Sequence, residues 1–118
     1  MAAKDELGKR GEALAALFLQ NAGYEILERN WRCPQGEIDL IARDGGDTVF
    51  VEVKTRSSMA FGHPLEAITE AKLARLRRLA QSWCQAHPGQ HHSIRIDAIA
   101  VLAPARGAAR FDHLQRVF

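Results

Sequence analysis

The sequence is poor in cysteine, and this limits the chemistry available to it. Cys33 and Cys84 are its two cysteines, and neither has a cysteine neighbour at a zinc-binding spacing. A disulfide between them would require an oxidising compartment, so two reduced thiols packed as small side chains is the favoured interpretation. A glycine-rich phosphate loop and a Ser/His/Asp arrangement are also missing, which argues against the common nucleotide-binding and serine-hydrolase motifs.

Long apolar runs are absent as well. No stretch approaches the ~20 apolar residues that a membrane-spanning helix needs. The N-terminal residues 1–6 lack the basic start and the apolar stretch of a secretory signal. We therefore expect a cytoplasmic protein with no membrane association.

The remaining composition is that of an ordinary globular protein. Of 118 residues, 47% are apolar and 25% charged, which is enough apolar material for a buried core and argues against disorder. Internal repeats, low-complexity tracts and linkers are not evident. Residues 1–118 are therefore expected to form a single domain.

Hydrophobic periodicity and turn residues predict the elements in outline. Helical spacing covers residues 6–22 and 65–86, and strand-like runs cover 24–31, 37–42, 48–54 and 94–102. An irregular loop is expected over 103–110, and 111–118 forms either a short strand or a helical turn. The order α-β-β-β-α-β predicts an α/β fold, in which a mixed sheet is flanked by helices.

The segment around Gly45 and Gly46 carries the strongest local signal, because two glycines between strand-like runs predict a hairpin. With these glycines at the centre of the turn, three pairs share one face of the sheet: Ile41 with Phe50, Asp39 with Glu52, and Glu37 with Lys54. Asp39 and Glu52 would then lie with Cβ atoms about 5 Å apart, an unfavourable like-charge pair. An arrangement that costs stability suggests a function, and a bound divalent cation would remove the repulsion.

These residue types suit phosphodiester chemistry. Mg²⁺ prefers oxygen ligands and is commonly held by one or two carboxylates, here Asp39 and Glu52. Lys54 follows Glu52 on the same face and would place a positive charge near the attacking water or the developing phosphorane. Glu37 either pairs with Lys54 or ligates the metal, and these two interpretations stand about level. Glu12 would reach the same site if the first helix packs beside the hairpin.

A longer pattern in the sequence resembles a known family. Gly36-Glu-Ile-Asp-Leu-Ile-Ala42 followed by Val49-Phe-Val-Glu-Val-Lys-Thr-Arg56 resembles the YraN-like family of small bacterial proteins. Asp39 followed by Glu52-Val53-Lys54 is similar to the PD-(D/E)xK nuclease signature. Further matches are Gly8-Lys-Arg-Gly-Glu12, Gly23-Tyr-Glu-Ile-Leu27, Asn30-Trp-Arg32 and Thr69-Glu-Ala-Lys72.

The resemblance implies a restriction-endonuclease-like fold, similar to that of archaeal Holliday-junction resolvases. It also implies roles for individual residues. Asp39 and Glu52 would ligate Mg²⁺ or Mn²⁺, with the carbonyl of Val53 as a third ligand. Lys54 would be the catalytic lysine, and Glu12 the acid contributed by the first helix.

Basic residues outside this cluster suggest a polyanionic partner. If Glu12, Glu37, Asp39 and Glu52 are confined to a metal site, ten of the 14 acids remain to face 16 Lys and Arg. The nucleic-acid contacts that we expect come from Lys72, Arg56, Arg32 and Arg75.

The favoured function is metal-dependent hydrolysis of phosphodiester bonds in DNA, rather than RNA, with branched or structured DNA as a candidate substrate. A homodimer is expected, since symmetric cutting of two strands requires two sites. Two alternatives stay open at this point. One is a non-catalytic nucleic-acid-binding module that retained the fold, and the other is an accessory subunit that acts only with a partner.

Overall fold

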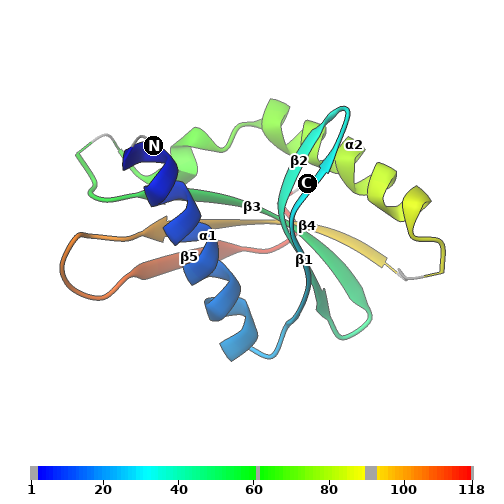
Figure 1. The fold of residues 1–118 in the computed structure, drawn as a ribbon, viewed down its shortest axis with the longest axis horizontal. Helices are drawn as coiled ribbons and strands as arrows, with labels where there is room; N and C mark the ends of the chain where they lie inside the picture. Colours follow the sequence, from blue (N-terminus) through cyan, green and yellow to red (C-terminus); the bar gives the residue numbers. More distant parts are fainter. Residues whose placement is uncertain (1–2, 61, 90–92, 118) are drawn as a thin grey trace.

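A computed structural model describes residues 3–60, 62–89 and 93–117 (Figure 1). The elements in chain order are α1 (Ala3–Asn21), β1 (Glu25–Cys33), β2 (Gly36–Asp44), β3 (Asp47–Arg56), the 3-10 helix η1 (Pro64–Ala67), α2 (Glu70–Ala86), β4 (Ser93–Leu102) and β5 (Arg110–Leu114). Among these residues, no helix is both long and apolar enough to cross a membrane. Both cysteines carry free thiols, as the composition suggested.

The strands form one mixed sheet in the order β1-β2-β3-β4-β5. Strands β3 and β4 run parallel, with α2 in the connection between them, and the other neighbouring pairs are antiparallel. The predicted α/β fold with a mixed sheet and flanking helices is confirmed. The tail, for which a strand and a helical turn were both open, contributes the edge strand β5.

Helix α1 covers one face of the sheet (Figure 1). Its residues Ala15, Ala16 and Leu19 are fully buried and pack in one cluster with Leu40 and Val51 of the central strands. Small alanine side chains let the helix approach the sheet closely. The burial of this apolar stripe, rather than helix propensity, holds α1 in place.

Helix α2 covers the opposite face. Its buried stripe includes Leu76, Leu79 and Trp83, which pack with Ile41 and Phe50 of the sheet. The rings of Trp83 and Phe50 meet edge to face with centroids 5.6 Å apart. The alternation predicted for the hairpin therefore holds here: Ile41 and Phe50 point to one helix, and Leu40 and Val51 to the other.

The predicted helix over 65–86 is wrong at its start. Residues 64–67 form η1, and α2 begins only at Glu70. Between them Ile68 and Thr69 are extended, with ψ of 104° and 164°. The reason is capping: the Thr69 hydroxyl accepts a hydrogen bond from the Lys72 N–H at 3.2 Å, which fixes the helix N-terminus there.

A buried ion pair lies at the end of the sheet where the β2–β3 hairpin turns. Arg95 and Asp97 of β4 are 4% and 0% exposed, and two hydrogen bonds of 3.0 Å join them. Arg95 also binds Asp44 at 2.9 Å, and the Asp97 carboxylate accepts the Arg116 N–H at 3.1 Å. The His113 Nε2 lies 2.7 Å from Asp97. This cluster ties the hairpin and the C-terminal segment to the middle of the sheet.

Helix α1 lies close against the sheet at Gly11. A β-carbon at this position would lie 1.8 Å from the Thr55 Oγ1 and 2.6 Å from the Thr55 Cβ and Cγ2. We predict that Gly11→Ala destabilises the protein by about 1–3 kcal/mol, because the helix must shift away from β3. Chemical denaturation at constant pH measures this change in the free energy of unfolding.

Gly8 on the same helix provides a matched control, because a β-carbon there would meet no atom within 4 Å. Gly8→Ala should stabilise the protein by about 0.5–1 kcal/mol through helix propensity alone. The double variant Gly11→Ala/Thr55→Ala should recover part of the loss. Equal stabilities for the two single alanine variants would contradict the close-contact explanation.

Candidate functional site

The hairpin register is as predicted near the turn but not along its full length. The cross-strand pairs follow the expected register from Asp44 with Asp47 at the turn to Leu40 with Val51. The β2–β3 ladder ends at this last pair. Beyond it, the Asp39 carboxylate reaches across and its Oδ2 accepts the Val53 N–H at 2.9 Å. The expected cross-strand pairs of Asp39 with Glu52 and Glu37 with Lys54 are therefore absent from the ladder. The Asp39 side chain thus accepts the Val53 N–H in place of a backbone carbonyl of β2.

Three carboxylates converge at this break in the ladder. Oxygen atoms of Glu12, Glu37 and Asp39 all lie within 4.8 Å of one another. Glu12 comes from α1, directly after the glycine that packs on β3, and the other two come from β2. The first-helix acid, which the sequence could place only conditionally, thus joins the hairpin acids.

Two residues of β1 hold Glu37 from the other side. With its amide nitrogen facing the acids, Asn30 donates to Glu37 Oε1 at 3.0 Å and to Glu12 Oε1 at 2.8 Å. The Arg32 Nε donates to Glu37 Oε2 at 2.8 Å. Arg32, expected to contact nucleic acid, therefore forms an ion pair with a carboxylate of the cluster.

Glu52 lies on the α2 side of the break. It shares a cavity of about 180 Å³ with Glu37, Asp39, Lys72, Arg75 and two leucines of α2. Its carboxyl group interacts electrostatically with Asp39, and with the cations Lys72 and Arg75. Asp39 and Glu52 are thus near each other because they line the same cavity, and not because they pair across the strands. Asp39 also belongs to the carboxylate group on the α1 side.

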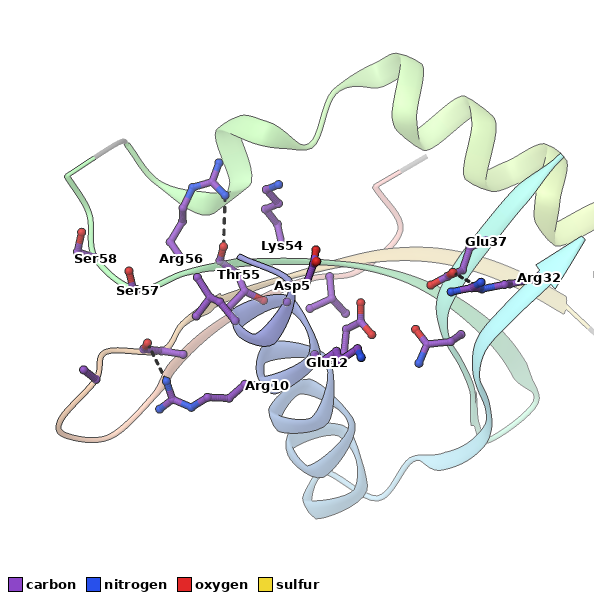
Figure 2. A pocket seen from close by; sticks show the side chains of 17 residues that line it. Asp5, Arg10, Glu12, Arg32, Glu37, Lys54, Thr55, Arg56, Ser57 and Ser58 are labelled. Carbon is purple, nitrogen blue, oxygen red and sulfur yellow. Dashed lines mark hydrogen bonds and ion pairs between the residues drawn. The ribbon is translucent and has the colours of Figure 1, made fainter. Parts of the chain in front are cut away.

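A larger groove opens on the α1 side, with a volume of about 1280 Å³. Figure 2 shows Glu12 and Glu37 in this groove and Lys54 pointing away from α1. The basic side chains along it are Lys9, Arg10, Arg32, Lys54 and Arg56. Arg10 also fixes α1 to the β4–β5 connection, by donating to the carbonyls of Ala103 and Pro104 at 3.2 and 3.0 Å.

The remaining predicted residues fall around these two spaces. Arg56 lines the groove, and its Nη1 donates to the Thr55 carbonyl at 3.2 Å. Lys72 and Arg75 line the smaller cavity, where the Lys72 ammonium donates to the Ala67 carbonyl at 2.9 Å. In a strand, the N–H and C=O of one residue point the same way, so the Val53 carbonyl is directed into the gap beside Asp39.

Asn30 belongs to the site, although the sequence pattern marked it only as part of a family match and gave it no role. It lies between the pairs Arg29–Leu40 and Trp31–Ile38, which places it in register with Asp39. Its φ of +53° turns the side chain out of the regular strand alternation. The only local signal is the residue type, because asparagine tolerates the left-handed region better than other side chains.

Three acids of the site, Glu12, Asp39 and Glu52, resist ionisation. Burial, and then repulsion by Asp39 and Glu37, raises the pKa of Glu12 to about 7. Burial raises the pKa of Asp39 to about 6, against the opposing hydrogen bond from Val53. Burial and the charge of Asp39 raise the pKa of Glu52 to about 7, although Lys72 and Arg75 lower it. Crowded carboxylates with raised pKa values and oxygen-only donors fit a hard divalent cation such as Mg²⁺ or Mn²⁺.

Comparison with known proteins places the chain in a family. Residues 11–101 match the model of "Uncharacterised protein family UPF0102". The chain belongs to the UPF0102 family. The resemblance to the YraN-like family is thereby confirmed, and the matched range includes every acid of this UPF0102 protein's candidate site.

Relatives that match along nearly the whole chain carry the same family name. A UPF0102 protein of Beutenbergia cavernae is 58% identical over 117 residues, covering 99% of each chain. One from Arthrobacter sp. strain FB24 is 53% identical over 117 residues, also covering 99% of each. One from Frankia alni is 49% identical over 118 residues, covering 100% of this chain and 98% of its own.

The raised pKa values predict how stability depends on pH. Between about pH 4.5 and 7, the folded state keeps protons on Glu12, Asp39 and Glu52 that the unfolded chain has already released. Stability without divalent cations should therefore fall as pH rises through this window, and the whole cost should be present above pH 7. Thermal melts in a chelating buffer from pH 5 to 8 measure the slope.

Asp39→Asn should flatten this slope and raise the melting temperature at pH 8 by a few degrees. The asparagine amide oxygen can still accept the Val53 N–H, but the charge that repels Glu12 and Glu52 is gone. Glu25→Gln, an exposed acid at the start of β1, is the control and should leave the slope unchanged. If Asp39→Asn and the native protein showed the same dependence of melting temperature on pH, the site acids would not be the cause of the slope.

Proposed function

We propose that this protein is a Mg²⁺- or Mn²⁺-dependent endonuclease that hydrolyses phosphodiester bonds in DNA. The observation that carries the proposal is the convergence of carboxylates from α1 and β2 within 4.8 Å, at a break in the sheet, beside Glu52 and a basic groove. Stability alone would favour neutral or opposite charges at these positions, so function is the better explanation for the acids.

Each acid has a role in this proposal. Asp39, with one oxygen fixed by the Val53 N–H, presents its other oxygen as a ligand, and Glu12 and Glu37 complete the group on the α1 side. Glu52 and the Val53 carbonyl provide ligands from β3. A bound divalent cation would supply Lewis-acid activation and charge neutralisation for the hydrolysis.

Lys54 would stabilise the charge that develops on the phosphate. It shares a face of β3 with Glu52, lines the groove, and interacts electrostatically with both Asp39 and Glu52. Its ammonium group could therefore act on a phosphate held at the acids.

The basic side chains favour a nucleic-acid substrate. Arg10, Arg32 and Arg56 lie along the groove, and Lys72 and Arg75 lie on the other side of the acids. Cations around an acidic centre suit a polyanion whose backbone is held on both sides of the scissile bond. We further propose DNA rather than RNA, a restriction-endonuclease-like fold related to the Holliday-junction resolvases, and a homodimer that presents two sites to two strands.

Cleavage assays test the reaction directly. Linear, nicked, flapped and four-way DNA, and structured RNA, are incubated with Mg²⁺, Mn²⁺ or chelator. Asp39→Asn and Lys54→Met should each lower the metal-dependent cleavage rate by about 10²–10³-fold, since each removes charge from the reacting centre. Lys54→Arg should retain more activity than Lys54→Met, and Glu25→Gln should cut at the native rate.

The same assay decides between the enzyme and the alternatives. Binding without metal-dependent cutting on any substrate, unaffected by the two substitutions, would identify a non-catalytic nucleic-acid-binding module. Cutting that appears only after a partner protein is added would identify an accessory subunit. Cutting that survives Asp39→Asn would show that the activity arises elsewhere.

DNA binding should depend on salt in proportion to the number of phosphate contacts. In chelator, Arg56→Gln and Lys72→Gln should each weaken duplex binding and reduce the slope of log K against log salt by about 0.9. Arg77→Gln, an exposed cation of α2 outside both the groove and the cavity, is the control. Fluorescence anisotropy across a salt series measures the slopes, and three equal slopes would contradict the assigned binding face.

A further inference from the structure

Asn30 adopts a backbone conformation that needs a reason. Its φ is +53°, and among the described residues Arg116 is the only other non-glycine with positive φ. Glycine would occupy this region without steric cost, whereas a side chain here is tolerated mainly for asparagine and aspartate. The strand therefore accepts some strain in order to keep an amide group at this position.

The amide bridges two acids that belong to different layers of the fold. Its nitrogen lies 2.8 Å from Glu12 Oε1 on α1 and 3.0 Å from Glu37 Oε1 on β2, so each of its two N–H groups has a carboxylate acceptor. Arg32 binds the outer oxygen of Glu37. Its side chain is 79% exposed, so it contributes little to fixing the pair.

We propose that Asn30 is a positioning residue that holds Glu12 and Glu37 at ligand spacing before a divalent cation binds. Two carboxylates this close repel each other, and each would otherwise turn away toward solvent. Two charge-assisted hydrogen bonds from one neutral group oppose the repulsion without adding a positive charge that would compete with the cation. The inference rests on the proposed function only in taking these acids as cation ligands.

A neutral donor suits this task better than a cation would. A lysine or arginine at the same point would neutralise the acids and compete with Mg²⁺ for them. An aspartate would tolerate the backbone but would add a third negative charge and donate nothing. Asparagine satisfies the backbone conformation, the donor geometry and the charge requirement together.

Asn30→Gly tests the proposal, because glycine keeps the positive φ without strain and removes only the amide. Mn²⁺ binding to the purified full chain, without nucleic acid, is measured by isothermal titration calorimetry at pH 7.5. We expect Mn²⁺ affinity to fall by about 10–100-fold, as is typical when a group that orients a metal ligand is lost. Asn21→Gly, which changes the chain's other asparagine at the end of α1, should bind Mn²⁺ like the native protein.

A double-mutant cycle separates positioning from a merely structural role. In a Glu12→Gln background, Asn30 no longer has two carboxylates to hold together, so Asn30→Gly should weaken Mn²⁺ binding by much less than in the native chain. Far-UV circular dichroism and thermal melting at pH 5 confirm that each variant folds. Additive losses in the cycle, or native affinity in Asn30→Gly, would overturn the proposal.

Absence of the metal site and absence of the positioning role give different results in these measurements. If the native protein binds no Mn²⁺, the metal site itself is absent, and both this inference and the proposed function are overturned. If the native protein binds Mn²⁺ and Asn30→Gly binds it equally well, only the positioning role falls. If Asn30→Gly loses Mn²⁺ affinity and the losses in the double-mutant cycle are not additive, both the metal site and the positioning role are supported.

Discussion

The hydrogen bond from the Val53 N–H to the Asp39 carboxylate is the interaction on which the site depends. It replaces a backbone acceptor with a side chain at the point where the β2–β3 ladder would otherwise continue. Two central strands can then separate without leaving this N–H unsatisfied in the interior. The separation creates space for carboxylates in the middle of the molecule, and it opens that space toward both faces of the sheet.

The rest of the fold supplies rigid surroundings for this opening. Each acid is carried by an element whose position is fixed by packing elsewhere: α1 by its alanine-rich stripe and the Gly11 contact, and β2 and β3 by the hydrophobic clusters on both faces. The acids consequently remain close, and their burial, together with their mutual repulsion, raises the pKa values of Glu12, Asp39 and Glu52. The free energy that offsets the cost of crowding these carboxylates comes from apolar burial remote from them.

Local sequence signals predicted most of the fold but only part of the site. Gly45 and Gly46 determine the hairpin register correctly as far as Leu40 and Val51, because turn geometry and alternation act over short distances. The register beyond Leu40 depends on a carboxylate replacing a backbone group, which no residue pattern encodes. The approach of Glu12 and the bridge by Asn30 are tertiary contacts across three elements. The start of α2 differs from the prediction for a local reason: helical periodicity continues through Ile68, but Ile68 and Thr69 are extended and the Thr69 side chain caps the first turn of α2.

The buried Arg95–Asp97 pair links the C-terminal segment to the interior of the sheet. Asp97 is fully enclosed, and its neighbours include His113 and the backbone of Arg116, close to the last described residue. A carboxylate that loses such partners is costly to bury, so the segment over residues 113–116 helps to keep β4 in the sheet. Strand β4 in turn pairs with β3, which carries Glu52 and Lys54. The C-terminal residues therefore stabilise the strand that carries half of the site, although they lie outside both of its cavities.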